Sequence, residues 1–249
     1  MSPLGTNGGS LSSAEISSPR ALSVGIIAID GPAGSGKSSV GKSVASQIGF
    51  RFLDTGLMYR ATTWYAIKSG VDMHNPKAVI MVASQMEVSV HTGEAGENLI
   101  VVNGEDVTGF LHSTGVDDSV SFVSAISRVR EMMVAEQRSL ASEGKIVMVG
   151  RDIGTVVIPN APLKIYLTAS ARTRAVRRHR DFVAAATAAE RQKIDFEETL
   201  RSIEKRDLVD SSRTDSPLRP ADDAVVLDTD GLTLNQVVIR VVELARAGI

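Results

Sequence analysis

The chain has 249 residues, of which 43% are hydrophobic and 22% are charged, and its formal net charge is -2. This composition indicates a globular protein and argues against binding nucleic acid through bulk positive charge. The absence of cysteine excludes disulfides and thiolate metal sites, and the four histidines lack metal-ligand spacing. No apolar run reaches the ~18 residues of a membrane-spanning helix, so we expect a cytoplasmic protein that binds no membrane.

In chain order, a segment rich in Ser, Gly and Pro precedes a regular alternation of short apolar segments and helical ones. We expect residues 1–22 to form a flexible tail and residues 23–249 to form a single domain. Strands are predicted at 24–30, 51–54, 145–149, 163–168 and 224–228, and helices at 37–48, at about 56–68 and from 234 onward. Such an alternation indicates an α/β fold, with a parallel sheet covered by helices on both faces.

Residues 86–108 break this alternation, because they contain short strand-like runs joined by Gly-rich and Asn-Gly turns. This pattern predicts a small antiparallel sheet inserted into the α/β core.

The segment from residue 31 to 38 fits the phosphate-loop pattern G-x-x-x-x-G-K-[ST] and stands between a predicted strand and a predicted helix. Its glycines let backbone N–H groups surround phosphate oxygens, and the helix adds its positive N-terminal end. Lys37 should bridge the β- and γ-phosphates, and the Ser38 hydroxyl should ligate Mg²⁺. We therefore predict binding of a nucleoside triphosphate by Gly31, Pro32, Ala33, Gly34, Ser35, Gly36, Lys37, Ser38 and Ser39.

The loop alone leaves open whether the γ-phosphate goes to water, as in switches and motors, or to a second substrate, as in small kinases. The guanine-binding pattern N-K-x-D is absent. The strand at 145–149 runs into Gly150 and Arg151, without the acidic strand end that motor ATPases use for metal and water. These missing parts favour a kinase.

Two polar groups follow predicted strands, at the edge where an open parallel sheet binds its ligands. Asp54 and Thr55 lead into Tyr59 and Arg60, an aromatic ring and a forked cation that suit a sugar and a phosphate. Asp54 and Thr55 are equally compatible with an ordinary helix cap.

The second group, at 150–155, places Arg151 beside Asp152 after a strand that should be buried. The two charges are compatible with a structural ion pair. They also suit a nucleotide site, because an arginine binds phosphate and a carboxylate accepts from an exocyclic amine.

Two helical segments, 170–180 and 203–213, are rich in arginine. They are compatible with a solvated helix face or, less well because interleaved aromatics are missing, with a nucleic-acid surface. The more specific hypothesis is a lid that brings arginines to a transferring phosphoryl group, where positive charge is the main catalyst. An acceptor that is itself a phosphate needs no general base.

Taken together, these motifs resemble those of the bacterial cytidylate kinases, in the nucleoside monophosphate kinase group. The resemblance runs from about residue 25 to the C-terminal helix, through IDGPAGSGKSSV, FLDTGLMYRA, VNGEDVTG, SRVRE, GRDIGTVVIPNAPLKIYLTAS and RDLVDSSR. It implies a monophosphate-binding lobe at about 56–125 that contains the antiparallel sheet, and a helical lid at about 170–205. It also implies phosphorylation of CMP and dCMP by ATP with Mg²⁺.

The resemblance further implies roles for individual residues. Cytosine would be recognised by Ser121, Arg130 and Asp152, and the ribose region by Tyr59, Arg206 and Asp210. The acceptor phosphate would be surrounded by Arg60, Arg151 and Arg213, with Thr55 in the same site. The catalytic set would be Lys37, Arg151, Arg174 and Arg178, the last two as lid arginines.

One position departs from a pattern of the family, whose members often have an acidic residue before Gly-Arg-Asp. Here that residue is Val149. We therefore hypothesise weaker Mg²⁺ affinity, with Ser38, water, the nucleotide or another acid such as Asp30 replacing the missing carboxylate. We expect a monomer whose partners are ATP and CMP or dCMP. Another small-molecule kinase, or a nucleotide-dependent nucleic-acid binder, remains the alternative.

Overall fold

The computed structural model describes residues 25–187, 191 and 194–248, so the predicted tail at 1–22 lies outside the described residues. A five-stranded sheet forms the centre, with the strand order β2-β6-β1-β7-β8. Each of its pairings is parallel. The strands are β1 (Ile26–Asp30), β2 (Arg51–Asp54), β6 (Ile146–Val149), β7 (Leu163–Thr168) and β8 (Val225–Asp228).

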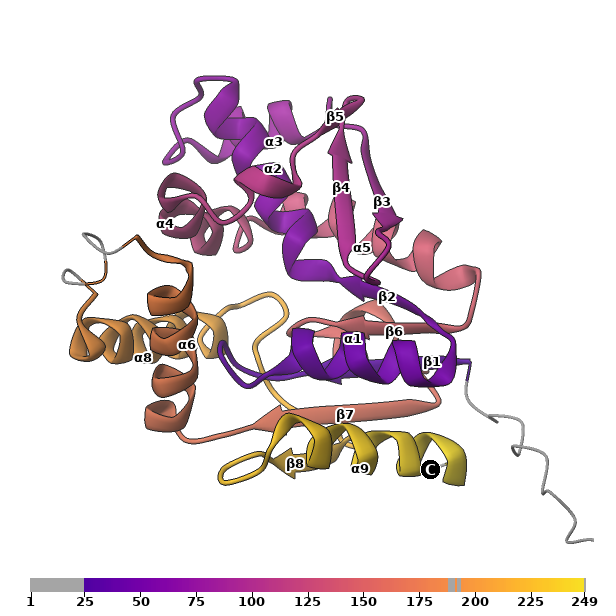
Figure 1. Ribbon diagram of the computed structural model, residues 1–249. Coiled ribbons are helices and arrows are strands. Elements are labelled where there is room, and N and C mark those ends of the chain that lie inside the picture. The colour runs from indigo at the N-terminus through magenta and orange to yellow at the C-terminus, as the bar shows by residue number, and fades with distance from the viewer. Residues whose placement is uncertain (1–24, 188–190, 192–193, 249) are drawn as a thin grey trace, which may run out of the picture.

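Helices flank this sheet on both sides (Figure 1). Their bounds are α1 (Lys37–Ile48), α2 (Thr55–Lys68), α3 (Pro76–Ala83), α4 (Thr114–Val123), α5 (Ser127–Ser142), α6 (Ala171–Ala185), α8 (Phe196–Ser211) and α9 (Leu234–Ala247). The described residues also form two short turns, the 3-10 turn η1 (Thr108–Phe110) and the π-helical turn η2 (Ile153–Val157). None of the helices in this described part of the chain is both long and apolar enough to cross a membrane.

The two faces of the sheet belong to two hydrophobic clusters. Ile27, Val147 and Ile165 lie in the cluster that α1 and α9 cover. Ala28 and Met148, their neighbours along the same strands, lie in the cluster covered by α2 and α5. The pleat of each strand sends successive side chains to opposite faces, and both faces are apolar because both are covered. The predicted α/β fold is confirmed.

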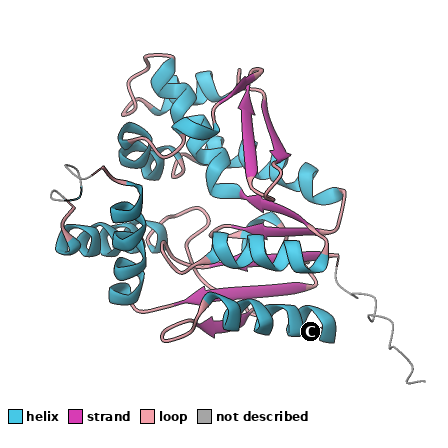
Figure 2. Cartoon of the chain, in the orientation of Figure 1, coloured by secondary structure: helices cyan, strands magenta, loops and turns pink. Residues whose placement is uncertain are grey.

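The predicted antiparallel insertion is a sheet with the order β3-β4-β5 (Figure 2). Asn103 and Gly104, with φ of 49° and 83°, form the turn between β4 and β5, as an Asn-Gly pair favours. The Asn98 side chain accepts from Asp54 N and donates to Phe52 O, and so fixes this sheet to β2. The strands are β3 (Val88–Thr92), β4 (Asn98–Val102) and β5 (Glu105–Asp106).

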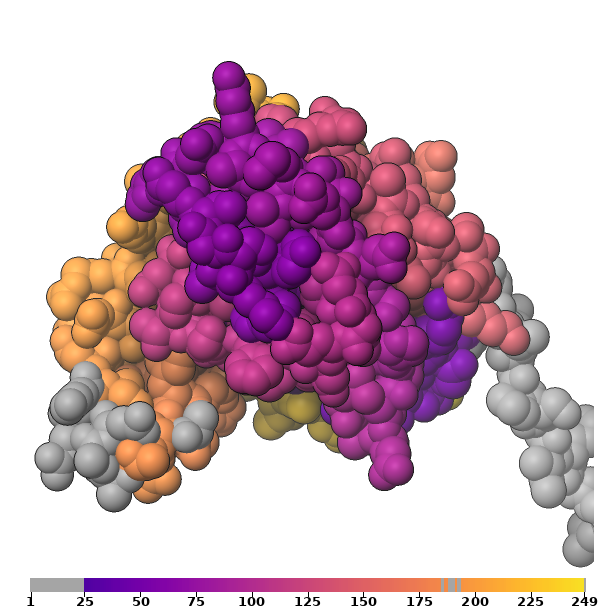
Figure 3. All heavy atoms as spheres, turned by 90° about the horizontal axis from the view of Figure 1, so that it is seen from above, coloured from indigo at the N-terminus to yellow at the C-terminus, as the bar shows by residue number. Residues whose placement is uncertain are grey.

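Helices α6 and α8, which lie in or overlap the predicted lid segment, pack against each other beyond the carboxyl end of β7 (Figure 1). Seen from above, the violet and magenta residues of the predicted monophosphate lobe cover the middle of the molecule, and the orange residues of α6 lie at its edge (Figure 3). Helix α2 starts at Thr55, one residue earlier than predicted, because Asp54 Oδ1 accepts from Gly56 N and caps it.

Candidate active site

The carboxyl ends of β2, β6 and β1 lie side by side, because these three strands are neighbours in a parallel sheet. β1 ends at Asp30 directly before the phosphate loop, and β2 ends at Asp54. Val149, the last residue of β6, pairs with Ile29 on one side and with Asp54 on the other. The structure therefore brings the three predicted polar segments to one edge of the sheet, where ligands of such folds bind.

The phosphate loop has the backbone that its sequence predicts. Gly31, Gly34 and Gly36 have φ of 148°, 74° and 93°, values that L side chains rarely adopt. A Cβ on Gly31 would lie 2.1 Å from the carbonyl oxygen of Leu167, so the loop approaches β7 more closely than any side chain permits. Helix α1 begins directly after Gly36 and directs its free N–H groups toward the loop.

Lys37 lies over this loop. Its Nζ donates to Pro32 O at 2.7 Å and to Ser35 Oγ at 3.4 Å. Burial, together with the positive charge of Arg151, lowers the pKa of Lys37 to about 7. The ammonium group is therefore weakly solvated, which strengthens its interaction with an anion placed in the loop.

The hydroxyl of Ser38, the predicted metal ligand, donates to the Asp54 carboxylate. Asp54 is thus both the cap of α2 and the acid at the phosphate loop, so the two interpretations of its sequence are compatible. Within the described residues, no group of three or more His, Asp or Glu side chains could hold a metal ion without other ligands. A metal at this point would have to share its coordination with phosphates and water.

A buried ion pair joins two of the residues predicted to recognise cytosine. Arg130 contacts the carboxylate of Asp152, and the two residues are 5% and 4% exposed. Arg130 also donates to Ser124 O at 3.1 Å, and its guanidinium carbon lies 5.4 Å from the centre of the Tyr59 ring. Ser121, one turn earlier in α4, accepts from Ser124 Oγ through its carbonyl oxygen and so joins the group.

Asp210 is fully buried and surrounded by arginines from different segments. Its carboxylate lies 2.8 Å from Arg151, 2.5 Å from Arg213 and 4.0 Å from Arg206. Burial, followed by repulsion from Arg151, lowers the pKa of Arg206 to about 9. One carboxylate therefore faces several cations, and this excess of positive charge suits an anionic ligand.

Arg60 and Arg178 meet at an acid that the sequence did not single out. Arg60 donates to Leu111 O at 2.8 Å and lies 2.7 Å from Asp117, while Arg178 lies 3.9 Å from the same carboxylate. The predicted phosphate-binding arginine of α2 and a predicted lid arginine of α6 are thereby brought to one carboxylate of α4.

Arg174 has other partners. Its guanidinium forms a two-point ion pair with Asp207 of α8, with distances of 3.0 Å and 2.6 Å, and donates to Ala169 O and to Ala33 O. It therefore ties α6 to α8 and to the phosphate loop, and its catalytic role stays a prediction.

Two further predicted residues lie at the end of β6. The Thr55 hydroxyl donates to Val149 O at 2.9 Å, which joins α2 to this strand. Val149 is 1% exposed, and a Cβ on Gly41 would lie 2.4 Å from its Cγ1, so its side chain packs against α1. Asp54, its partner across the β2–β6 pairing, supplies a carboxylate one strand away.

Sequence reasoning did not assign Asp54, Asp117 or Asp207 as partners of the predicted site residues. A local signal existed only for Asp54, as a helix cap. Asp117 and Asp207 each pair with an arginine far away in the chain, and such pairings depend on how the helices pack.

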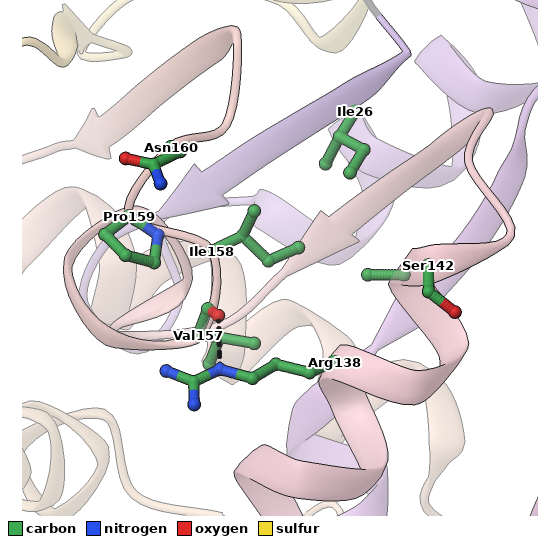
Figure 4. Close-up of a pocket in the computed structure, with 8 residues that line it drawn as sticks. Ile26, Arg138, Ser142, Val157, Ile158, Pro159 and Asn160 are labelled. Carbon is green, nitrogen blue, oxygen red and sulfur yellow. Dashed lines mark hydrogen bonds between the residues drawn. The ribbon is translucent and has the colours of Figure 1, made fainter.

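A separate hollow of about 240 Å³ lies at the amino end of β1, beside Ile26, at the opposite end of that strand from the phosphate loop. It is lined mainly by apolar groups, and the Arg138 guanidinium at its side donates to Val157 O at 2.9 Å (Figure 4). The polar groups described above lie elsewhere, so this hollow is not part of the site.

A family model described as cytidylate kinase matches residues 27–247. The chain belongs to the cytidylate kinase family. Among curated members of this family, the chain is 47% identical to the cytidylate kinase of Rhodococcus opacus over 86% of its own length and 92% of that protein. It is 44% identical to that of Geobacillus thermodenitrificans, covering 88% of this chain and 95% of the relative. It is 45% identical to that of Streptococcus sanguinis, covering 88% and 96%.

Proposed function

We propose that this member of the cytidylate kinase family transfers the γ-phosphoryl group of ATP to CMP or dCMP and produces CDP or dCDP. The observation that carries the proposal is that the predicted ATP site and the predicted CMP site lie next to each other. A phosphate loop follows β1, and the buried pair of Asp152 and Arg130 stands beside it, after the neighbouring strand β6.

On the donor side, the loop N–H groups and Lys37 would hold the ATP phosphates. Ser38 and Asp54 fit Mg²⁺, because their contacting oxygen atoms lie at the start of α1 and Mg²⁺ takes oxygen ligands while keeping several waters. When bound, Mg²⁺ supplies positive charge at the β- and γ-phosphate oxygens. Asp54 would bind Mg²⁺ in place of the acidic residue that the family often has at the position of Val149.

On the acceptor side, the Asp152 carboxylate can accept from the 4-amino group of cytosine while Arg130 holds it in place. Uracil presents a carbonyl oxygen at that position, which would face the carboxylate without a hydrogen bond. The arginines around Asp210, together with Arg60, would bind the acceptor phosphate.

The transfer itself requires positioning and charge. An oxygen of the acceptor phosphate attacks the γ-phosphorus, a new P–O bond forms, and the bond to the β–γ bridging oxygen breaks as ADP leaves. The attacking oxygen is already ionised, so no residue needs to remove a proton. Lys37, Arg151 and Arg178 would stabilise the charge that spreads over the transferring group.

We assign residues 56–125 to the monophosphate-binding lobe and residues 170–205 to the lid. The contacts of Asp117 with Arg60 and Arg178 support this assignment, because they join the two segments where the acceptor phosphate would lie. Closure of both segments would exclude water, which otherwise competes as an acceptor.

The test is ADP release, measured with CMP, dCMP, UMP, AMP, GMP and shikimate as acceptors at matched concentrations. CMP and dCMP should give the highest kcat/KM. A higher value with a purine nucleotide or with shikimate would overturn the assignment. ADP release that does not depend on any acceptor would identify the protein as a hydrolase instead.

A further inference from the structure

Asp30, the last residue of β1, is a buried acid to which the proposed mechanism gives no part. It is 4% exposed, yet its carboxylate forms no ion pair among the residues that the structure describes. Its two oxygens instead accept from two successive backbone groups: Oδ1 from Ile153 N at 2.8 Å and Oδ2 from Gly154 N at 2.7 Å. These two N–H groups open the turn η2, which Asp152 itself does not cap with its side chain.

The same end of β1 also binds the residues that precede this turn. Ile29 O accepts from Gly150 N at 3.0 Å, one residue before Arg151. Arg151 and Asp152 therefore stand between two attachments to β1, one through Ile29 and one through Asp30. Gly31, the next residue along the chain, is the first of the phosphate loop.

Only a carboxylate can serve both N–H groups, because an amide side chain has one acceptor and its NH2 group would face the second donor. This requirement comes with a cost, since burial disfavours the charged form and raises the pKa of Asp30 to about 6. The hydrogen bonds from Gly154 and Ile153 partly offset that rise. Asp152 in the turn raises the pKa further, and Lys37 of α1 lowers it. On β7, Tyr166 interacts electrostatically with Asp30, and the stem of Lys164 lies beside Asp30 Oδ2 at Gly154.

We infer that Asp30 is a positioning residue: it fixes the turn that carries Arg151 and Asp152 against the start of the phosphate loop, and so sets the acceptor site relative to the donor site. This inference rests on the proposed function, because Arg151 and Asp152 are taken as acceptor-site residues. Asp30 would act through those two residues, since its own oxygens accept from the backbone of the turn.

Protonation of Asp30 should weaken its attachment to the turn η2, as Asp30→Asn does. A protonated carboxyl group has one oxygen that carries hydrogen and accepts poorly, so one of the two N–H groups loses its partner. The acceptor site should therefore loosen as the pH falls through about 6, while the phosphate loop keeps its own hydrogen bonds.

The experiment compares the wild type with Asp30→Asn and with a matched control, Asp228→Asn. Asp228 also ends a strand of the same sheet and accepts from a backbone N–H group, but it is exposed and lies away from the turn. The expected result for Asp30→Asn is a fall in kcat/KM for CMP of about tenfold or more, in line with the loss of a hydrogen bond to a charged acceptor. Affinity for a non-hydrolysable ATP analogue should stay unchanged, and Asp228→Asn should behave as the wild type.

Equal losses of CMP and ATP-analogue binding in Asp30→Asn would mean that Asp30 only supports the fold, and would overturn the inference. A kcat/KM for CMP that is unchanged in Asp30→Asn would overturn the inference as well. Absence of CMP-dependent ADP release from the wild type would contradict the proposed function itself, so the two failures are distinguishable.

The pH profile gives an independent readout. The acceptor phosphate also titrates near pH 6, so the ratio of wild-type to Asp30→Asn kcat/KM is used, in which the ionisation of CMP cancels. This ratio should fall toward one between about pH 7 and about pH 5, and a constant ratio would contradict the inference. If Asp30→Asn does not fold, binding of cytidine, which has no phosphate, to the wild type should weaken below about pH 6. Binding that does not change with pH would overturn the proposal.

Discussion

Replacing Asp152 by Asn should change the base preference of the enzyme in a direction that follows from the proposed role of Asp152. Asp152 is 4% exposed and contacts Arg130 through one carboxylate oxygen, and we expect the other oxygen to accept from the cytosine amine. In Asp152→Asn, the amide oxygen must accept from Arg130, because a buried guanidinium without a partner is costly. The amide NH2 then takes the position that faces the base, where it repels the amine of cytosine and can donate to the carbonyl oxygen of uracil.

The size of the effect follows from the hydrogen bond that is exchanged. Leaving one buried polar group unpaired costs about 1–3 kcal/mol, and each 1.4 kcal/mol is about tenfold in a rate or binding constant. The ratio of kcat/KM for CMP to that for UMP should therefore fall by about 10- to 100-fold in Asp152→Asn. The CMP value should supply most of the change, and the UMP value should stay level or rise.

The assay is coupled ADP release with CMP and with UMP on the same preparations, and thermal unfolding shows that each variant is folded. Asp118→Asn is the matched control, because Asp118 is an exposed acid of α4. It should leave the ratio unchanged. A fall of equal size for CMP and UMP in Asp152→Asn would refute the role of Asp152 in base recognition.

Four further predictions concern the donor side. Lys37→Ala should lower kcat by about a hundredfold or more, because the phosphate loop loses its cation; a normal kcat would contradict this role. Asp54→Asn should raise the Mg²⁺ concentration needed for half-maximal ADP release, and an unchanged Mg²⁺ titration would show that Asp54 takes no part in Mg²⁺ binding. Val149→Glu should lower the Mg²⁺ concentration needed for half-maximal ADP release, provided that thermal unfolding shows that the larger side chain is accommodated against Gly41. If the wild type saturates at the same or a lower Mg²⁺ concentration than Val149→Glu, the hypothesis of weakened Mg²⁺ affinity is wrong. Gly31→Ala should abolish binding of a fluorescent ATP analogue, since its Cβ would lie 2.1 Å from a carbonyl oxygen, and retained binding would show that the loop can move aside.

The sequence predicted those parts of the fold whose determinants are local. The helix at 37–48 was placed with its observed bounds, because the phosphate loop fixes where α1 begins and Gly49, with φ of 70°, marks where it ends. The inserted sheet was placed from its turns, and Asn103 and Gly104 have the backbone that such a turn requires.

The partners of the site residues could not be predicted in the same way. Asp117 contacts Arg60 and Arg178 only because α4 packs against α2 and α8, and nothing near position 117 in the chain signals this. The sequence allows Asp30 to be a metal-binding acid, whereas in the structure its oxygens accept from the backbone of η2, more than a hundred residues later. A carboxylate at a strand end suits metal binding, helix capping and turn anchoring alike, and only the packing decides among them.

A kinase of this family and a hydrolase differ in whether the γ-phosphoryl group passes to the phosphate of CMP or to water. Incubation with γ-labelled ATP and CMP, followed by separation of the nucleotides, distinguishes the two. We expect the label in the β-phosphate of CDP, and we expect it to stay in ATP when CMP is omitted. Label that accumulates as inorganic phosphate at the same rate with and without CMP would show that the protein is a hydrolase.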